Sequence, residues 1–274
     1  MKILFVYSAQ KTIVPEKPLL GQEGIYHGLS SVAGMLHSNG YECDLLVLDR
    51  VNRKKNVCIL KDKVEKFNPS IVAFTAVFSE FEFICQIAKQ VKIHYSNLFL
   101  IAGGVHITLN PDESYLSLFD AICIGEGEYP MLELVERLEQ QKPIDGIQNL
   151  WVKTELGIKK NPVRPFIEDL DNLAFSYRAM WQQWILNPMT KPTVLLGRGC
   201  PYKCTYCCNH KLRKIACHLR RFQNQSNHRR LAGFCSCSCF CFGIGSGMDS
   251  DSGRGSCFIF HASAYRHASL PRGQ

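Results

Sequence analysis

The sequence has no uninterrupted apolar run that approaches the ~20 residues of a membrane-spanning helix. Its first residues, MKILFVYSAQ, lack the charged region and cleavable apolar stretch of a secretory signal. Lysine is absent beyond Lys214 and valine beyond Val194, which marks a change of composition towards the carboxyl end. From these absences we expect a cytoplasmic protein with no transmembrane segment.

Positive charge gathers in the last part of the chain rather than along a defined element. The formal net charge is +8, yet beyond Lys214 seven arginines face only Asp249 and Asp251. Nucleic-acid-binding proteins carry a basic patch or stripe on one structured face. The charge pattern therefore does not predict a nucleic-acid partner.

The 14 cysteines fall into two groups. Cys43, Cys58, Cys85 and Cys123 stand singly in predicted strands and helices, and we interpret them as small buried hydrophobic residues in a reducing compartment. The other cysteines cluster between positions 200 and 208 and between positions 217 and 257. Such clusters require a separate explanation, of which metal binding is the first to test.

Short apolar runs alternate with helical patterns over about the first 140 residues. The runs are continuous, which is typical of strands that are covered on both faces of a parallel sheet. The predicted strands span residues 2–8, 42–49, 70–77, 98–104 and 120–126, and the predicted helices span 24–38, 57–67, 80–94 and 130–140. This order predicts an α/β fold with a five-stranded, flavodoxin-like or Rossmann-like parallel sheet.

A sheet of this kind binds ligands at the carboxyl ends of its strands, near the point where the strand order reverses. Glycines at those ends allow a ligand to approach the backbone closely. The alternative is that they only form tight turns between a strand and the next helix. The candidate cofactor-binding residues at these ends are Thr75, Gly103, Gly104, His106, Gly125, Glu126, Gly127 and Glu128.

The rest of the chain divides into three parts. Residues 144–190 show a hairpin pattern around Gly157 followed by proline breakers, and we interpret them as a hairpin and linker. Residues 191–215 hold a predicted strand that runs into a cysteine loop. Residues 216–274 are rich in Cys, Gly and Ser without a helical or strand period, and we expect an out-of-frame or unselected, disordered tail, with a metal-binding cysteine array as the alternative.

The segment GRGCPYKCTYCCNHK contains the most specific motif of the chain. Cys200, Cys204 and Cys207 form a C-x3-C-x2-C pattern. Three thiolates on one loop can ligate three irons of a 4Fe–4S cluster and leave the fourth iron open to a substrate. A zinc site completed by Cys208 or His210, or a ferredoxin-type cluster, is a weaker alternative because the spacing suits neither well.

This segment resembles the cluster motif of radical S-adenosylmethionine (radical SAM) enzymes, with Tyr206 at the aromatic position. The resemblance implies that Cys200, Cys204 and Cys207 ligate a 4Fe–4S cluster and that Tyr206 packs near the adenine of S-adenosylmethionine. It also implies that residues 191–215 begin a partial (β/α) barrel. In that family the open iron binds S-adenosylmethionine, and an electron from the cluster cleaves it to a 5′-deoxyadenosyl radical. No catalytic side chain is assigned.

Residues 1–143 resemble the cobalamin-binding domain that precedes the radical domain in one large subfamily. The similarity lies in GGVHITLNPDE after the fourth predicted strand and GEGEYPMLEL after the fifth. It implies cobalamin as a further cofactor, methyl transfer or related radical chemistry on a small-molecule substrate, and an electron donor such as flavodoxin or ferredoxin. Residues 1 to about 166 are expected to fold and bind cobalamin by themselves.

Two features depart from the family pattern. The cobalt-binding motif D-x-H-x-x-G is absent, so we expect His106 to contact backbone or a cofactor amide rather than cobalt. The barrel also requires a longer chain beyond the cluster loop, which predicts a truncated or frameshifted, catalytically incomplete protein. The alternatives are a stand-alone cobalamin-binding module with a vestigial cluster loop and a zinc-stabilised interaction protein.

Overall fold

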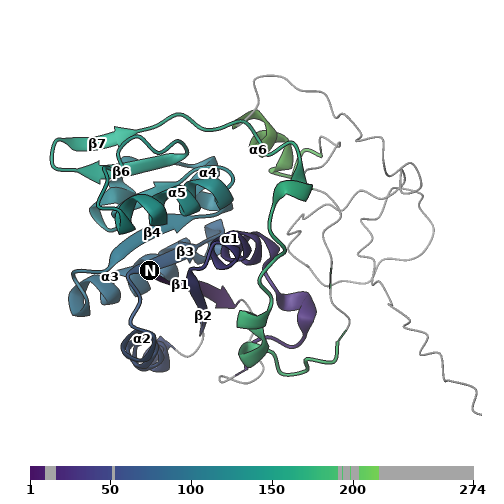
Figure 1. The fold of residues 1–274 in the computed structure, drawn as a ribbon. Coiled ribbons are helices and arrows are strands. Elements are labelled where there is room, and N and C mark those ends of the chain that lie inside the picture. Colours follow the sequence, from purple (N-terminus) through teal and green to yellow (C-terminus); the bar gives the residue numbers. More distant parts are fainter. Residues whose placement is uncertain (10–16, 51–52, 191–192, 194–197, 199–203, 216–274) are drawn as a thin grey trace, which may run out of the picture.

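The computed structural model describes residues 1–9, 17–50, 53–190, 193, 198 and 204–215. In this part of the chain a seven-stranded sheet has the order β2-β1-β3-β4-β5-β6-β7 (Figure 1). The strands are β1 Lys2–Ala9, β2 Glu42–Asp49, β3 Ile71–Thr75, β4 Phe99–Gly103, β5 Ala121–Cys123, β6 Leu150–Thr154 and β7 Gly157–Lys160. Cys200 and the predicted tail, residues 216–274, lie outside the described residues.

Strands β1 to β5 are parallel, which confirms the predicted flavodoxin-like α/β fold. Strand β1 lies between β2 and β3, so the strand order reverses at β1. Both faces of the sheet are covered, which explains why the strands are continuous apolar runs. In β1, for example, successive side chains from Ile3 to Val6 are all buried.

Helices α1 and α5 cover one face of the sheet, and α2, α3 and α4 cover the other (Figure 1). Their bounds are α1 His27–Ser38, α2 Arg53–Phe67, α3 Phe81–His94, α4 Val105–Leu109, α5 Glu128–Glu139 and, after the cysteine motif, α6 Asn209–Ile215. In α1, Leu29, Ala33 and Leu36 recur at helical spacing and are buried against the sheet. Within the described ranges, no helix is both long and apolar enough to cross a membrane.

Three of the predicted strands, 70–77, 98–104 and 120–126, are longer than β3, β4 and β5 of the structure. Strand β4 ends before Gly104 and β5 ends before Gly125, and these glycines have φ angles of 97° and 89°. A positive φ interrupts extended backbone, which is why each strand stops there. After Gly104 the chain turns directly into the short helix α4, where the sequence predicted a strand end and a loop.

The predicted hairpin is confirmed, and it extends the sheet. Strand β6 pairs antiparallel with β5, and β7 pairs antiparallel with β6. Gly157 follows the hairpin turn with a φ of 117°. The sheet of the domain is therefore mixed, with five parallel strands and an antiparallel edge.

After the hairpin, the chain returns across the face that α1 covers. The 3-10 helix Ala179–Trp184 carries Trp181, which is fully buried and donates a hydrogen bond from Nε1 to Ser30 Oγ at 2.8 Å. Further along, Ile185 forms a parallel bridge with Leu19. The division between residues 143 and 144 stays a prediction, but this later segment shares a core with α1.

Candidate functional site

The carboxyl ends of β3, β4 and β5 bring the predicted cofactor residues to one edge of the sheet. Thr75 and Gly103 are paired across β3 and β4. Among the described residues, a Cβ placed on Gly103 would meet only Cys123, with its nearest atom at an ordinary distance of 3.5 Å. The described residues therefore leave room for a methyl group at Gly103.

Gly104 is required by the packing of the protein itself, and Gly127 is closely packed. A Cβ on Gly104 would lie 2.7 Å from Thr75 Oγ1 and 2.9 Å from the carbonyl oxygen of Ala76. A Cβ on Gly127 would lie 3.2 Å from Val32, which belongs to α1. Substitution of Gly104 would therefore disturb the fold itself, whereas a side chain at Gly127 would require Val32 to shift slightly.

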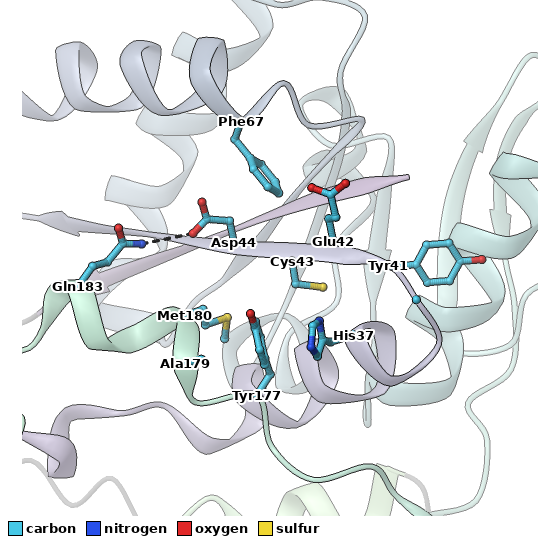
Figure 2. Close-up of a pocket in the computed structure, with 11 residues that line it drawn as sticks. His37, Tyr41, Glu42, Cys43, Asp44, Phe67, Tyr177, Ala179, Met180 and Gln183 are labelled. Carbon is cyan, nitrogen blue, oxygen red and sulfur yellow. Dashed lines mark hydrogen bonds between the residues drawn. The ribbon is translucent and has the colours of Figure 1, made fainter.

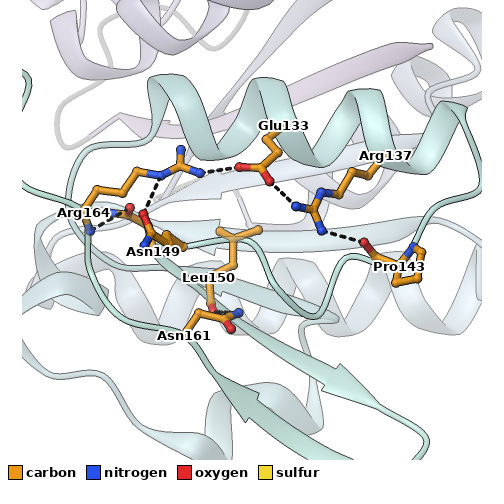
Figure 3. Close-up of polar contacts among 8 residues, drawn as sticks. Glu133, Arg137, Pro143, Asn149, Leu150, Asn161 and Arg164 are labelled. Atoms are coloured by element: carbon orange, nitrogen blue, oxygen red, sulfur yellow. Dashed lines mark hydrogen bonds and ion pairs between the residues drawn. The ribbon is translucent and has the colours of Figure 1, made fainter.

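Gly125 lies at the end of β5, where a buried asparagine supports the backbone. Its N–H donates to Thr108 Oγ1 at 3.0 Å. Asn149 donates from Nδ2 to the carbonyl oxygen of Ile124 at 2.7 Å. Its Oδ1 accepts from the N–H of Arg164 at 3.2 Å, and Figure 3 shows these two residues side by side. Asn149 is 2% exposed and has a φ of 71°. Sequence reasoning missed this residue, although asparagine adopts left-handed backbone more readily than most residues other than glycine.

We expect Asn149→Ala to lower the free energy of unfolding by about 3 kcal/mol, because it leaves buried polar groups unpaired and puts alanine in left-handed backbone. Asn161→Ala is the matched control, since Asn161 also donates a buried amide hydrogen bond, to the Leu150 carbonyl at 2.8 Å. Asn161 has no positive φ, so its loss is expected to be about 1 kcal/mol. Equal losses in chemical denaturation would contradict this role of Asn149.

Glu126 and Glu128 both bind Arg198. Arg198 donates from Nη1 to Glu126 Oε1 at 2.9 Å, and from Nη2 to Glu128 Oε1 at 2.5 Å and Ser31 Oγ at 2.9 Å. Glu126 Oε2 also accepts from the N–H of Ile167 at 2.7 Å. Burial alone would lower the pKa of Arg198, but Glu128 and Glu126 raise it above its usual range, so the guanidinium is charged. The cofactor roles predicted for the two glutamates stay predictions, and the structure gives both side chains a partner within the chain.

His106 lies in α4 among aromatic rings. Its Nε2 is 3.2 Å from Tyr115 Oη, and its ring centroid is 4.3 Å from that of Phe81. Burial lowers the pKa of His106, so the imidazole is neutral at pH 7. Its buried Nδ1 has no hydrogen-bond partner among the described residues. The predicted contact with backbone or a cofactor amide stays a prediction.

Two tyrosines that the sequence did not single out lie at the end of β1, where the strand order reverses. Tyr7 stacks on Tyr26 with centroids 5.7 Å apart and meets Trp181 edge-on at 5.3 Å. Burial raises the pKa of both tyrosines, so both hydroxyls are protonated at neutral pH. The next side chain, Ser8, is fully buried, and its Oγ lacks a hydrogen-bond partner in the described part of the chain. A buried hydroxyl without a protein partner is suited to a polar group of a ligand.

Two of the three predicted cluster ligands lie among the described residues. The N–H of Cys207 donates to the carbonyl oxygen of Cys204 at 3.1 Å, which closes a short turn just before α6. Tyr206, between them, is 83% exposed. Burial, and then the adjacent Cys207, raise the pKa of the Cys208 thiol. Outside the masked ranges, which include the first cysteine of the motif, no group of three His, Cys, Asp or Glu side chains is placed to hold a metal ion.

Two cavities lie on different sides of the domain. One of about 510 Å³ lies between the start of β2 and the segment around Gln183, which donates to Asp44 Oδ1 at 3.3 Å (Figure 2). It contains none of the predicted site residues. The other, of about 600 Å³, lies beside the end of β5, and its lining includes Thr108, Ile124, Val163 and Ile215.

Comparison with known proteins bears directly on this edge of the sheet. Residues 20–135 match the family model of the B12 binding domain. The matched range contains the carboxyl ends of β3, β4 and β5, and therefore every candidate residue from Thr75 to Glu128. The sequence prediction of a cobalamin-binding domain in this part of the chain agrees with that match.

Three curated relatives extend the comparison. The uncharacterized methyltransferase PH0819 of Pyrococcus horikoshii is 29% identical over 211 residues, which are 76% of this chain and 45% of that protein. An anaerobic magnesium-protoporphyrin IX monomethyl ester cyclase of Rubrivivax gelatinosus is 29% identical over 194 residues, 66% of this chain and 34% of that protein. The cobalamin-dependent radical SAM methyltransferase TokK of Streptomyces tokunonensis is 25% identical over 161 residues, 51% of this chain and 22% of that protein. The chain thus spans less than half the length of each of these relatives.

The fold and the matched range together define a Rossmann-like B12-binding domain. It lies in a chain that is similar to radical SAM proteins such as the cobalamin-dependent methyltransferase TokK.

Proposed function

We propose that this chain binds cobalamin at the carboxyl edge of its sheet, binds a 4Fe–4S cluster through Cys200, Cys204 and Cys207, and takes part in radical SAM chemistry. One observation carries the proposal. The turn after β5, which lies inside the B12-domain match, bonds directly to Arg198, two positions before the first cysteine of the motif. That contact brings the start of the cysteine motif to the strand ends that are predicted to bind cobalamin.

The strand ends fit a corrinoid in two respects. Gly103 leaves space over its backbone, and Thr75 is its partner on the next strand. Ser8 Oγ and His106 Nδ1 are buried polar atoms without a partner in the described part of the chain, and such atoms suit the amide groups of a corrinoid. The protein would bind and orient the cofactors and exclude water, while bound cobalamin supplies a methyl carrier and the cluster supplies an electron.

The proposed reaction is methyl transfer to a small-molecule substrate, with flavodoxin or ferredoxin as electron donor. Two of the three relatives are named as methyltransferases, and the third is named as a cyclase. Related radical chemistry is therefore the second candidate. The catalytic incompleteness of this chain stays a prediction, and multi-turnover formation of 5′-deoxyadenosine would contradict it.

Anaerobic reconstitution of the full chain with iron, sulfide and hydroxocobalamin tests the cofactor assignment. We expect one corrinoid and about four irons per chain, with iron–sulfur absorption in the visible spectrum. Corrinoid bands without iron–sulfur absorption would indicate that the protein is a cobalamin-binding module without a cluster. Failure to take up either cofactor would refute the proposal.

Gly103→Ala tests the place of cobalamin within the domain. We expect this variant to keep its stability and to bind hydroxocobalamin about tenfold more weakly, because the added methyl group fills space that the protein leaves open. Gly146→Ala is the matched control, since its Cβ would also meet an ordinary contact, at 3.7 Å from Arg137, and Gly146 lies away from the strand ends. Equal cobalamin affinity in the two variants, measured by absorbance titration, would exclude a close approach at Gly103.

A further inference from the structure

We infer that Arg198 is a positioning residue, which fixes the start of the cysteine loop at the carboxyl edge of the sheet by bonding to Glu126 and Glu128. Its catalytic purpose rests on the proposed function, but the contacts themselves belong to the protein without any cofactor. The inference assigns to the glutamates of the GEGE turn a role as anchors of the cysteine loop.

Arg198 and its partners Glu126, Glu128 and Ser31 form a polar cluster, which we call the clamp. The guanidinium reaches Glu126 and Glu128 at the start of α5 and Ser31 in α1. A guanidinium holds its donors in a fixed plane, so contacts with several acceptors set its orientation as well as its distance. Arg198 therefore joins the cysteine segment to both helices of one face of the domain.

Burial makes this cluster different from an ordinary surface ion pair. The side chain of Glu128 is 3% exposed, that of Glu126 is 20% exposed and that of Arg198 is 31% exposed. An ionised carboxylate is strongly unfavourable in a buried place without a positive partner. Loss of Arg198 would leave two neighbouring carboxylates without the cation that both contact, so the clamp is expected to be firmly held.

The chain between the clamp and the first predicted cluster ligand is short. Cys200 is two positions after Arg198, and two extended residues span at most about 7 Å. A misplacement of about 1 Å at a reacting centre can cost ~100-fold in rate. An anchor this close to a cluster ligand therefore limits where the cluster can lie relative to the strand ends.

The chain offers a matched control on the same helix. Arg164 Nη2 bonds to Glu133 of α5, and these side chains are 25% and 28% exposed. Figure 3 shows Arg164 and Arg137 on either side of Glu133. The Arg164–Glu133 pair joins α5 to the segment that follows the hairpin and has the same chemistry as the clamp, but it is remote from the cysteine motif in the sequence.

The first test uses the full chain without cofactors and measures hydrogen exchange in the peptide 204–215. Within this peptide the amides of Cys207, Lys211 and Leu212 are hydrogen-bonded. We expect Arg198→Gln to accelerate exchange there about tenfold and Arg164→Gln to leave it unchanged. Arg198→Lys should be intermediate, because an ammonium group replaces the planar fork with a point charge. Equal exchange in Arg198→Gln and Arg164→Gln would overturn the inference.

The second test measures the rate at which an iron chelator removes iron from the reconstituted protein, with and without hydroxocobalamin. We expect hydroxocobalamin to slow iron loss at least about threefold in the unmodified chain and in Arg164→Gln, because the cofactor covers the cluster when both are held at one edge. Arg198→Gln should bind as much hydroxocobalamin yet lose this protection. Full protection in Arg198→Gln would overturn the inference. An unmodified chain that takes up neither cofactor would instead contradict the proposed function, and the exchange experiment would still decide the role of Arg198.

Discussion

Replacement of Cys204 or Cys207 by alanine is expected to abolish iron–sulfur incorporation, whereas Cys208→Ala is expected to retain it. Two thiolates on a loop do not hold a 4Fe–4S cluster stably, so loss of either ligand removes the cluster. The turn between Cys204 and Cys207, closed by a 3.1 Å hydrogen bond, keeps both in one short loop. Cys208 supports α6 through its backbone, because its carbonyl oxygen accepts hydrogen bonds from the N–H groups of Lys211 and Leu212. The alanine variant keeps this carbonyl group.

Iron and acid-labile sulfide per chain, measured after anaerobic reconstitution, would test these variants. Cys58→Ala is the control, because Cys58 is a free cysteine in α2 that belongs to no predicted cluster and is exposed, not buried as the sequence predicted. It should take up as much iron as the unmodified chain. Retention of iron by Cys204→Ala, or its loss from Cys208→Ala, would show that the ligand assignment is wrong.

The sequence pattern predicts that residues 1 to about 166 fold by themselves, but from the structure we expect a fragment that ends after Phe166 to be far less stable than one that ends after Thr190. The shorter fragment lacks Met180, Trp181 and Ile185, which are 5%, 0% and 1% exposed and pack in the core beside α1. Removing one large buried side chain costs about 3 to 5 kcal/mol, and whole domains are stable by about 5 to 15 kcal/mol. The loss of all three is therefore expected to unfold the shorter fragment or leave it loosely packed.

Near-ultraviolet circular dichroism and urea denaturation of the two fragments would test this boundary. The fragment 1–190 should show a cooperative transition, and the fragment 1–166 should show little tertiary signal. Trp181→Ala in the fragment 1–190 separates the effect of the core from that of chain length, because it removes the indole that bonds to Ser30. A shared denaturation midpoint for all three proteins would contradict the packing argument.

Much of the fold follows from local sequence pattern. Each predicted strand and helix of the first 143 residues has a counterpart in the structure, because burial on both faces of a sheet and on one side of a helix leaves its period in the sequence. The ends of β4 and β5 were misplaced, since an apolar run does not reveal that Gly104 or Gly125 takes a positive φ. The short helix α4 was missed because Val105–Leu109 is too brief to show a helical period.

For the candidate site too, the sequence predicted one part and only the structure supplied the other. The sequence placed Thr75, Gly103 and the GEGE turn at strand ends, because the chain order of an α/β protein fixes which ends share an edge. It treated Gly103 and Gly104 alike. Their surroundings in the structure distinguish them. An added Cβ would make an ordinary 3.5 Å contact at Gly103, whereas at Gly104 it would lie only 2.7 Å from its nearest atom.

The sequence by itself determined the five parallel strands, the longer helices between them and the C-x3-C-x2-C motif, since each is written in neighbouring residues. The tertiary structure decided how the two regions are joined. Arg198 meets Glu126 and Glu128 across 72 and 70 positions, and Trp181 meets Ser30 across 151. Contacts across such separations leave no local period, because their partners become neighbours only when the sheet, α1 and α5 pack together.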